Sequence, residues 1–135
     1  MAVDKATLMA LADVADAQTL PLWRSTSLTH ETKEDGSPVT DADRAAEAAL
    51  LDALRERFPD DGFLGEETGP RRPGAPRRWV VDGIDGTGSF IAGHEEWSTL
   101  IAAVVDAVAV AGVVSGPAIG TRWWTTGGVA HRKSQ

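Results

Sequence analysis

Residues 79–87 read WVVDGIDGT. The first three are apolar and prone to extended structure, so they predict a short buried strand that ends at Asp82. A second aspartate, Asp85, follows on a glycine-rich turn, and residues 87–92 predict a helical turn. Carboxylates at a strand end can converge on one place, where Mg²⁺ takes carboxylate oxygens as ligands. Taken alone, the same residues also fit an ordinary Asp-Gly turn.

The end of this stretch adds a possibility for anion binding. Gly86 lets the backbone approach a ligand closely, because it has no side chain. If a helix begins there, the amides of Gly86 and Thr87 can cradle a phosphate oxygen. The Thr87 hydroxyl can also orient a water molecule.

Two further acidic motifs lie upstream. Residues 65–68 read GEET and follow a short apolar run, so Glu66 can supply a carboxylate to a metal, although a Glu-Glu pair is usually a solvated one. Residues 37–43 read SPVTDAD. Thr40 followed by Asp43 is typical of a capping box that opens a helix, and the alternative places Asp43 at the edge of the metal site.

The flanking sequence predicts two helices followed by several strands. Apolar residues recur at helical spacing in residues 4–23 and from Asp41 to about Arg57, with prolines as stops. We expect polar or glycine-rich loops at residues 25–38 and 68–78, and strands at 99–105, 108–114 and 119–126. This order favours an α+β fold rather than strict alternation of strands and helices.

Composition narrows the function classes. The 135-residue chain has a net charge of −7, which argues against nonspecific binding of nucleic acid. It has no cysteine, which excludes thiolate metal sites and thiol nucleophiles and fits a cytoplasmic protein. Residues 100–114 form the longest apolar stretch, which is short for a membrane span and is interrupted by Asp106. We therefore expect no membrane partner.

The motifs occur in an order that resembles the inositol monophosphatase superfamily. They are V-T-x-x-D at residues 39–43, G-E-E at 65–67, W-V-x-D-x-I-D-G-T at 79–87 and G-V-V-x-x-P at 112–117. The resemblance covers nearly the whole chain. Residues 97–102, 113–118 and 122–124 are most similar to the bacterial histidinol-phosphate phosphatase branch, whose substrate belongs to histidine biosynthesis.

The resemblance implies a layered α/β sandwich of the sugar-phosphatase type and a Mg²⁺-dependent phosphomonoesterase. Glu66, Asp82, the Ile84 carbonyl and Asp85 would hold about two or three Mg²⁺ ions, and Asp43 with Thr87 would orient the attacking water. The substrate would be a small phosphorylated metabolite, histidinol phosphate first and inositol monophosphate second. Lithium inhibition, common in the family, would follow from occupation of one metal position. Relatives commonly form homodimers.

The sequence departs from the family pattern in two ways. Gly83 stands where the family usually has proline, and glycine gives the turn more backbone freedom. Family members run to about twice this length, so we expect residues 1–135 to correspond to the N-terminal portion of such a domain, with the C-terminal half absent. The alternative function is therefore a truncated, catalytically weak or inactive metal-binding fragment.

Overall fold

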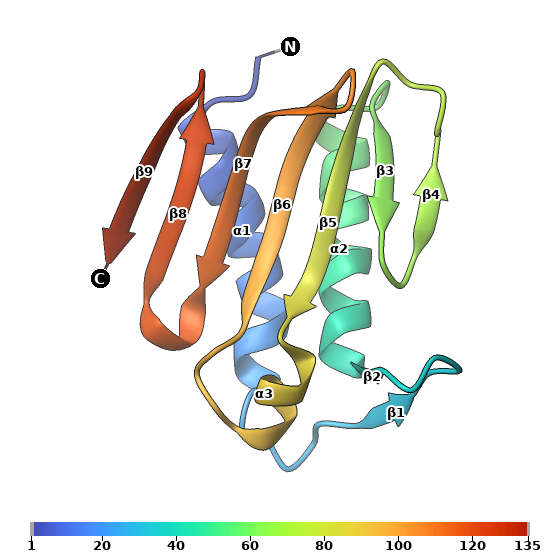
Figure 1. Ribbon diagram of the computed structural model, residues 1–135, viewed down its shortest axis with the longest axis vertical. Helices are drawn as coiled ribbons and strands as arrows, with labels where there is room; N and C mark the ends of the chain where they lie inside the picture. The colour runs from blue at the N-terminus through green and yellow to red at the C-terminus, as the bar shows by residue number, and fades with distance from the viewer. Residues whose placement is uncertain (1, 135) are drawn as a thin grey trace.

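A computed structural model describes residues 2–134 as one large sheet with helices on one face (Figure 1). No helix in this part of the chain is long and apolar enough to cross a membrane. The helices are α1 (Lys5–Thr19), α2 (Asp41–Arg57) and α3 (Thr87–Ala92), with 3₁₀ turns at Leu20–Leu22 and Pro117–Ile119. The strands are β1 (His30–Thr32), β2 (Pro38–Thr40), β3 (Gly62–Gly65), β4 (Gly69–Arg71), β5 (Arg77–Asp85), β6 (Ser98–Val105), β7 (Val108–Gly116), β8 (Thr121–Thr126) and β9 (Val129–Ser134).

The large sheet has the strand order β4-β3-β5-β6-β7-β8-β9, and β1 pairs with β2 in a separate hairpin. All neighbours in the large sheet are antiparallel except β3 and β5, which run parallel. Parallel pairing brings the carboxyl ends of β3 and β5 side by side at the same end of the sheet. The motif after β3 and the motif at the end of β5 therefore become neighbours.

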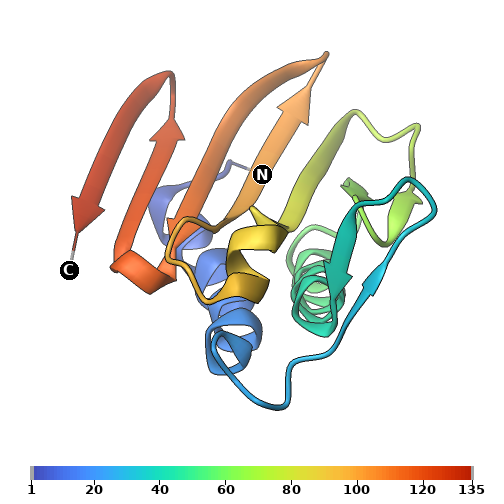
Figure 2. The same ribbon diagram turned by 60° about the horizontal axis from the view of Figure 1, so that its bottom comes forward.

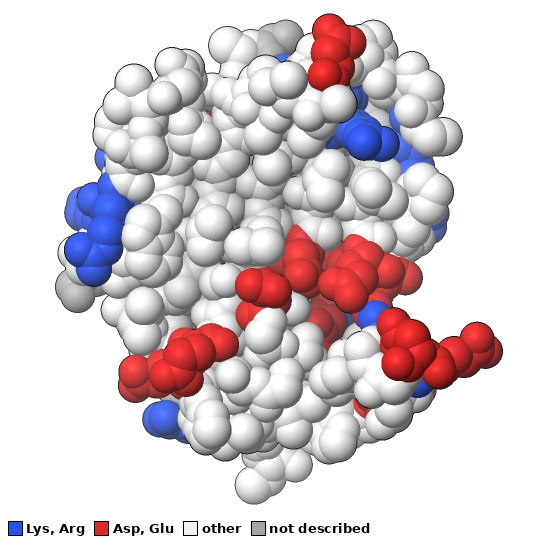
Figure 3. Space-filling view, viewed as in Figure 1, with Lys and Arg blue, Asp and Glu red and all other residues white. Residues whose placement is uncertain are grey.

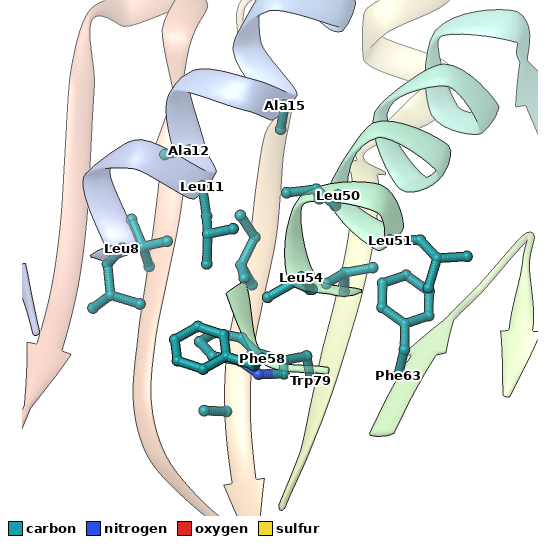
Figure 4. Close-up of a cluster of buried hydrophobic side chains, with 14 of the residues drawn as sticks. Leu8, Leu11, Ala12, Ala15, Leu50, Leu51, Leu54, Phe58, Phe63 and Trp79 are labelled. Carbon is teal, nitrogen blue, oxygen red and sulfur yellow. The ribbon is translucent and has the colours of Figure 1, made fainter. Parts of the chain in front are cut away.

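Helices α1 and α2 cover one face of the sheet and bury the main core (Figures 1 and 2). The apolar stripes predicted from the sequence face inward, and the core side chains interlock with Phe58, Phe63 and Trp79 (Figure 4). Trp79 has no exposed surface and stacks on Phe58 with ring centroids 5.4 Å apart. The other face of the sheet has no helix over it in either view.

A second, smaller core lies under α3. It contains Ala42, Ile84, Phe90 and Trp97, all buried. Phe90 meets Trp97 edge to face, with centroids 4.7 Å apart. Because Ala42 belongs to α2 and Ile84 to β5, this cluster fixes the start of α2 against the end of β5, where the predicted site residues lie.

The predicted α+β order and layering are confirmed, with three local differences. Residues 69–71 were expected in a loop but form strand β4, an edge strand paired with β3. Residues 129–134, for which no strand was predicted, pair with β8 as β9. The loop predicted at residues 25–38 includes β1 and the first residue of β2. All three are short or exposed, so they have no apolar alternation by which to be recognised.

Candidate functional site

Strand β5 ends in an irregular segment that carries both aspartates. Asp82 pairs with Leu100 of β6 and Asp85 pairs with Ser98, and the register shifts between them. The intervening Gly83 carbonyl accepts a hydrogen bond from the Thr99 hydroxyl at 2.8 Å. A bulge of this kind changes the direction in which the following side chains point. Here it separates half-buried Asp82 from exposed Asp85.

Gly83 permits a close contact between β5 and α2. A Cβ atom at this position would lie 2.7 Å from the Asp43 carbonyl oxygen and 3.2 Å from the Ala46 Cβ. Real Cβ atoms essentially never lie as close as 2.7 Å to another atom. The Asp43 carbonyl belongs to the backbone, so it cannot move aside as a flexible side chain could. In this chain, therefore, the glycine lets the first turn of α2 lie directly against the strand that carries Asp82.

Gly86 and Thr87 form the junction between β5 and α3. Gly86 has a φ of 88°, and a Cβ atom there would lie 2.7 Å from the Glu96 carbonyl oxygen, so conformation and space both favour glycine. The Thr87 hydroxyl lies 3.1 Å from Asp43 Oδ1 and 3.2 Å from the Ile84 carbonyl oxygen. This threonine therefore links two motifs that are 44 residues apart in sequence.

Asp43 uses its two carboxylate oxygens differently. Its Oδ2 accepts hydrogen bonds from the Thr40 amide at 2.8 Å and the Thr40 hydroxyl at 2.6 Å, and the Asp43 amide donates to that hydroxyl. This is the capping box predicted from the sequence, and it is confirmed. Oδ1 is directed to Thr87 instead. Burial raises the pKa of Asp43, while its bonds to Thr40 and Thr87 oppose that rise.

Glu66 and Glu67 follow β3 and share one cation. Lys33 Nζ donates to Glu67 Oε1 at 2.7 Å and lies 3.4 Å from Glu66 Oε1. Glu66 is exposed, whereas only 12% of the Glu67 side chain is. The bond to Glu67 is the main cause of the raised pKa of Lys33. The loop before β2 thus brings a positive charge to the edge of the acidic group.

Asp82 is the electrostatic centre of these carboxylates. Its pKa is raised to about 7, first by burial and then by the negative charges of Glu66, Asp85, Asp43 and Glu47. Negative charges on α2, on the turn after β3 and on β5 therefore raise the pKa of Asp82 at the carboxyl ends of β3 and β5. A space-filling view shows acidic side chains gathered over the ends of β3 and β5 (Figure 3).

These side chains suit a hard divalent cation by their chemistry. All the donors are carboxylate or carbonyl oxygens, and their mutual repulsion would be offset by positive charge. Among residues 2–134, however, no three histidine, aspartate or glutamate side chains already stand as a group that could hold a metal ion. A hollow of about 450 Å³ lined by Glu66 and Asp82 lies beside them. The carboxylates are thus close enough to affect the pKa of Asp82, but those of residues 2–134 do not form a compact set of three metal ligands.

Glu47 belongs to this group but was not predicted from the sequence. It lies on α2 with 1% of its surface exposed, and its Oε2 accepts three hydrogen bonds from Glu67 and Thr68. Burial raises its pKa, and these bonds oppose the rise. Its position four residues after Asp43, on the same side of a helix, is a signal that could have identified it.

Comparison with known proteins places these motifs in context. The model of the inositol monophosphatase family matches residues 3–134. A histidinol-phosphatase of Mycobacterium tuberculosis is 46% identical over 120 residues, which are 89% of this chain and 46% of that protein. A histidinol-phosphatase of Streptomyces coelicolor is 45% identical over 118 residues, which are 84% of this chain and 44% of that protein. The chain spans about half the length of the curated relatives it matches.

Solved structures share the fold over the same extent. The suhB extragenic suppressor protein of Bartonella henselae superposes with a TM-score of 0.86 at 26% identity, covering 94% of this chain and 50% of that one. An inositol monophosphatase of Zymomonas mobilis superposes with a TM-score of 0.77 at 40% identity, covering 95% and 49%. The whole fold described above therefore corresponds to about half of each of these proteins.

Proposed function

Because the chain belongs to the inositol monophosphatase family, we propose that it acts as a Mg²⁺-dependent phosphatase on a small phosphorylated metabolite. The observation that carries this proposal is the junction of two motifs that lie far apart in the sequence. Thr87 lies within hydrogen-bonding distance of Asp43 and of the Ile84 carbonyl. Asp82 stands beside them, with a pKa that burial and neighbouring carboxylates raise to about 7.

Four groups would hold the metal: the carboxylates of Glu66, Asp82 and Asp85 and the carbonyl oxygen of Ile84. Bound Mg²⁺ would neutralise charge on the phosphate ester and favour ionisation of a water molecule beside it. The Ile84 side chain is buried in the small core under α3, which fixes the direction of its carbonyl. Gly86 and Thr87 are the proposed contacts for the phosphate, at the start of α3.

The Asp43–Thr87 pair would orient the attacking water. The Thr87 hydroxyl can donate to Asp43 Oδ1 and accept a hydrogen bond from water through its lone pairs. A proton released by that water can then pass through the hydroxyl to Asp43. Burial raises the pKa of Asp43, so this carboxylate accepts a proton more readily than an exposed aspartate does.

Histidinol phosphate is the substrate we propose first. Two relatives more than 40% identical to this chain carry the name histidinol-phosphatase. Inositol monophosphate is the second candidate, since a solved inositol monophosphatase is 40% identical. A third relative, from Salmonella typhimurium, is named a 3'(2'),5'-bisphosphate nucleotidase and is 38% identical over 75% of this chain.

The direct test is phosphate release by the purified chain. It would be incubated with Mg²⁺ and each of the three phosphate esters, with the Asp82→Asn variant as control. We expect release from histidinol phosphate that depends on Mg²⁺ and is lost in the variant. If the chain releases no phosphate under conditions in which the full-length Mycobacterium tuberculosis relative is active, phosphatase activity of this chain is contradicted.

The alternative is a metal-binding fragment with weak or no turnover. The observation that favours it is the extent of the match, because this chain spans about half of each relative's length. Calorimetric titration with Mg²⁺, combined with the phosphate-release assay, separates the two proposals. Binding without phosphate release supports the fragment, whereas binding with release from one ester supports the enzyme.

A further inference from the structure

The buried Glu47 carboxylate has no place in the ligand set or the water-orienting pair described above. It projects from α2 and is 1% exposed. A carboxylate so deeply buried is unfavourable unless hydrogen bonds compensate for the lost hydration. The groups that donate those hydrogen bonds therefore indicate what Glu47 does.

The three donors to Glu47 all belong to the turn that follows β3. Its Oε2 accepts from the Glu67 amide at 2.9 Å, the Thr68 amide at 2.9 Å and the Thr68 hydroxyl at 3.0 Å. Bonds from backbone amides to an ionised oxygen are among the stronger hydrogen bonds in proteins. A single oxygen atom thus anchors the peptide units that immediately follow Glu66.

Gly65 leaves the space that this anchor needs. A Cβ atom at position 65 would lie 2.7 Å from Glu47 Oε2 and 3.0 Å from its carboxyl carbon. Any larger residue would push the carboxylate away from the turn or push the turn away from α2. The absence of a side chain at Gly65 therefore allows Glu47 to reach the turn that follows β3.

We propose that Glu47 is a positioning residue that holds the Glu66–Glu67 turn in the geometry required to bind Mg²⁺. This inference rests on the proposed function, since it assigns Glu47 a part in the same metal site. Glu47 acts through the backbone amides and Thr68 and contacts neither metal nor substrate. Partners that orient metal ligands from behind typically change metal affinity by roughly 10- to 100-fold when they are removed.

The test combines Glu47→Gln with a matched control on the same helix. Glu56 is exposed on α2, so Glu56→Gln removes the same charge without touching the turn. Mg²⁺ affinity would be measured by titration calorimetry, and the amide signals of Glu67 and Thr68 by ¹H–¹⁵N spectroscopy without metal. We expect Glu47→Gln to shift both amide signals and to weaken Mg²⁺ binding roughly 10- to 100-fold, and Glu56→Gln to do neither.

A second pair of variants keeps the proposal falsifiable if Glu47→Gln does not fold. Thr68→Val removes one donor to Glu47 and is expected to weaken Mg²⁺ binding relative to the wild-type chain, whereas Thr68→Ser keeps the donor and is expected to retain wild-type affinity. A purely structural brace would lower the unfolding midpoint and leave Mg²⁺ affinity at the wild-type value, which would overturn the proposal. If the wild-type chain binds no Mg²⁺, both the proposed function and this role fail. If it binds Mg²⁺ and Glu47→Gln leaves the affinity unchanged, only this role fails.

Discussion

At the scale of single residues, Asp43 shows how one carboxylate can serve both the fold and the proposed site. Its Oδ2 closes the capping box with Thr40, and its Oδ1 receives the Thr87 hydroxyl. The two interpretations of this residue in the sequence, as a helix cap and as a site residue, are therefore compatible. The cap fixes the side-chain rotamer, and the rotamer directs Oδ1 to Thr87.

Thr87→Val should separate the hydroxyl's contribution from the shape of the side chain. The variant removes a hydrogen bond to a buried carboxylate, so we expect the free energy of unfolding to fall by about 1–3 kcal/mol in urea titrations. If the chain turns substrate over, we expect phosphate release to fall roughly 100-fold or more, because the water loses its orienting hydroxyl. Thr87→Ser, which keeps the hydroxyl, should retain most of both. Equal stability and activity in the valine and wild-type chains would contradict this role.

The raised pKa of Asp82 makes a prediction about pH. Burial and the surrounding carboxylates raise this pKa to about 7 in the folded state, compared with about 3.9 in an unfolded chain. The folded state therefore binds this proton more tightly, and the resulting stabilisation is fully present below about pH 4 and is lost as pH rises through about 7. The urea midpoint of the metal-free chain should accordingly fall between pH 5 and pH 8.

Two measurements check the origin of that pH dependence. Asp82→Asn removes the titrating group, so the variant should lose much of the change between pH 5 and pH 8. Saturating Mg²⁺ should also flatten the profile, because a cation favours the ionised carboxylate. A metal-free wild-type chain that becomes more stable over this range would contradict the assignment.

Most candidate residues of this site could be proposed from the sequence because they belong to compact motifs. Glu66, Asp82, Asp85 and Thr87 each stand at a strand end or on a glycine-rich turn. Their roles stay predictions, although the structure brings their segments together. Glu47 lies outside these motifs. Its spacing of four residues from Asp43 was a weak signal, since a glutamate beside an apolar stripe usually faces solvent. Its function depends on the tertiary approach of the β3 turn to α2, which no local pattern encodes.

At the scale of elements, the contact between α2 and β5 determines how closely the site residues approach. The two elements meet at Gly83, where the strand backbone lies against the first turn of the helix. The small core of Ala42, Ile84, Phe90 and Trp97 packs beside this contact. The packing around Gly83 therefore depends on the absence of a side chain at this position.

Gly83→Ala should disturb this packing. Its Cβ would lie 2.7 Å from a backbone oxygen of α2, so the helix and the strand must separate. We expect the free energy of unfolding to fall by about 1–3 kcal/mol, the usual range for overpacking. Gly74→Ala is the matched control, because no atom lies within 4 Å of its Cβ position. Urea denaturation of the two variants measures the difference, and equal stability would contradict the close contact.

Among the elements, helices and central strands were easier to predict than edges. Helix α2 has clear apolar periodicity and the β6–β7 hairpin consists of long apolar runs, and both agree with the predicted ranges within a few residues. Strands β4 and β9 lie at the two edges of the sheet. Every residue of β9 is exposed, so its pairing comes from backbone hydrogen bonds to β8 rather than from an alternating pattern.

At the scale of the whole molecule, the sheet has two unlike faces. Helices cover one face, and the opposite face is largely uncharged in the region above the acidic group (Figure 3). A shallow apolar groove of about 410 Å³ runs over this open face, and Leu100, Ala102, Val114 and Trp123 are among its lining residues. Asp82 pairs with Leu100 in register, so one lining residue of the groove lies beside Asp82.

An exposed apolar face of this kind favours association in water. We therefore expect the isolated chain to bind the dye ANS and to show species larger than a monomer in sedimentation velocity experiments. Trp123→Lys places a charge on the open face and should reduce both signals. Val129→Lys is the matched control. Val129 is 58% exposed and begins the edge strand β9, where it pairs with Thr126 of β8. It does not line the groove. A compact wild-type monomer that binds no ANS would contradict association through the open apolar face. If the two lysine substitutions reduced association equally, the effect would come from general surface charge instead.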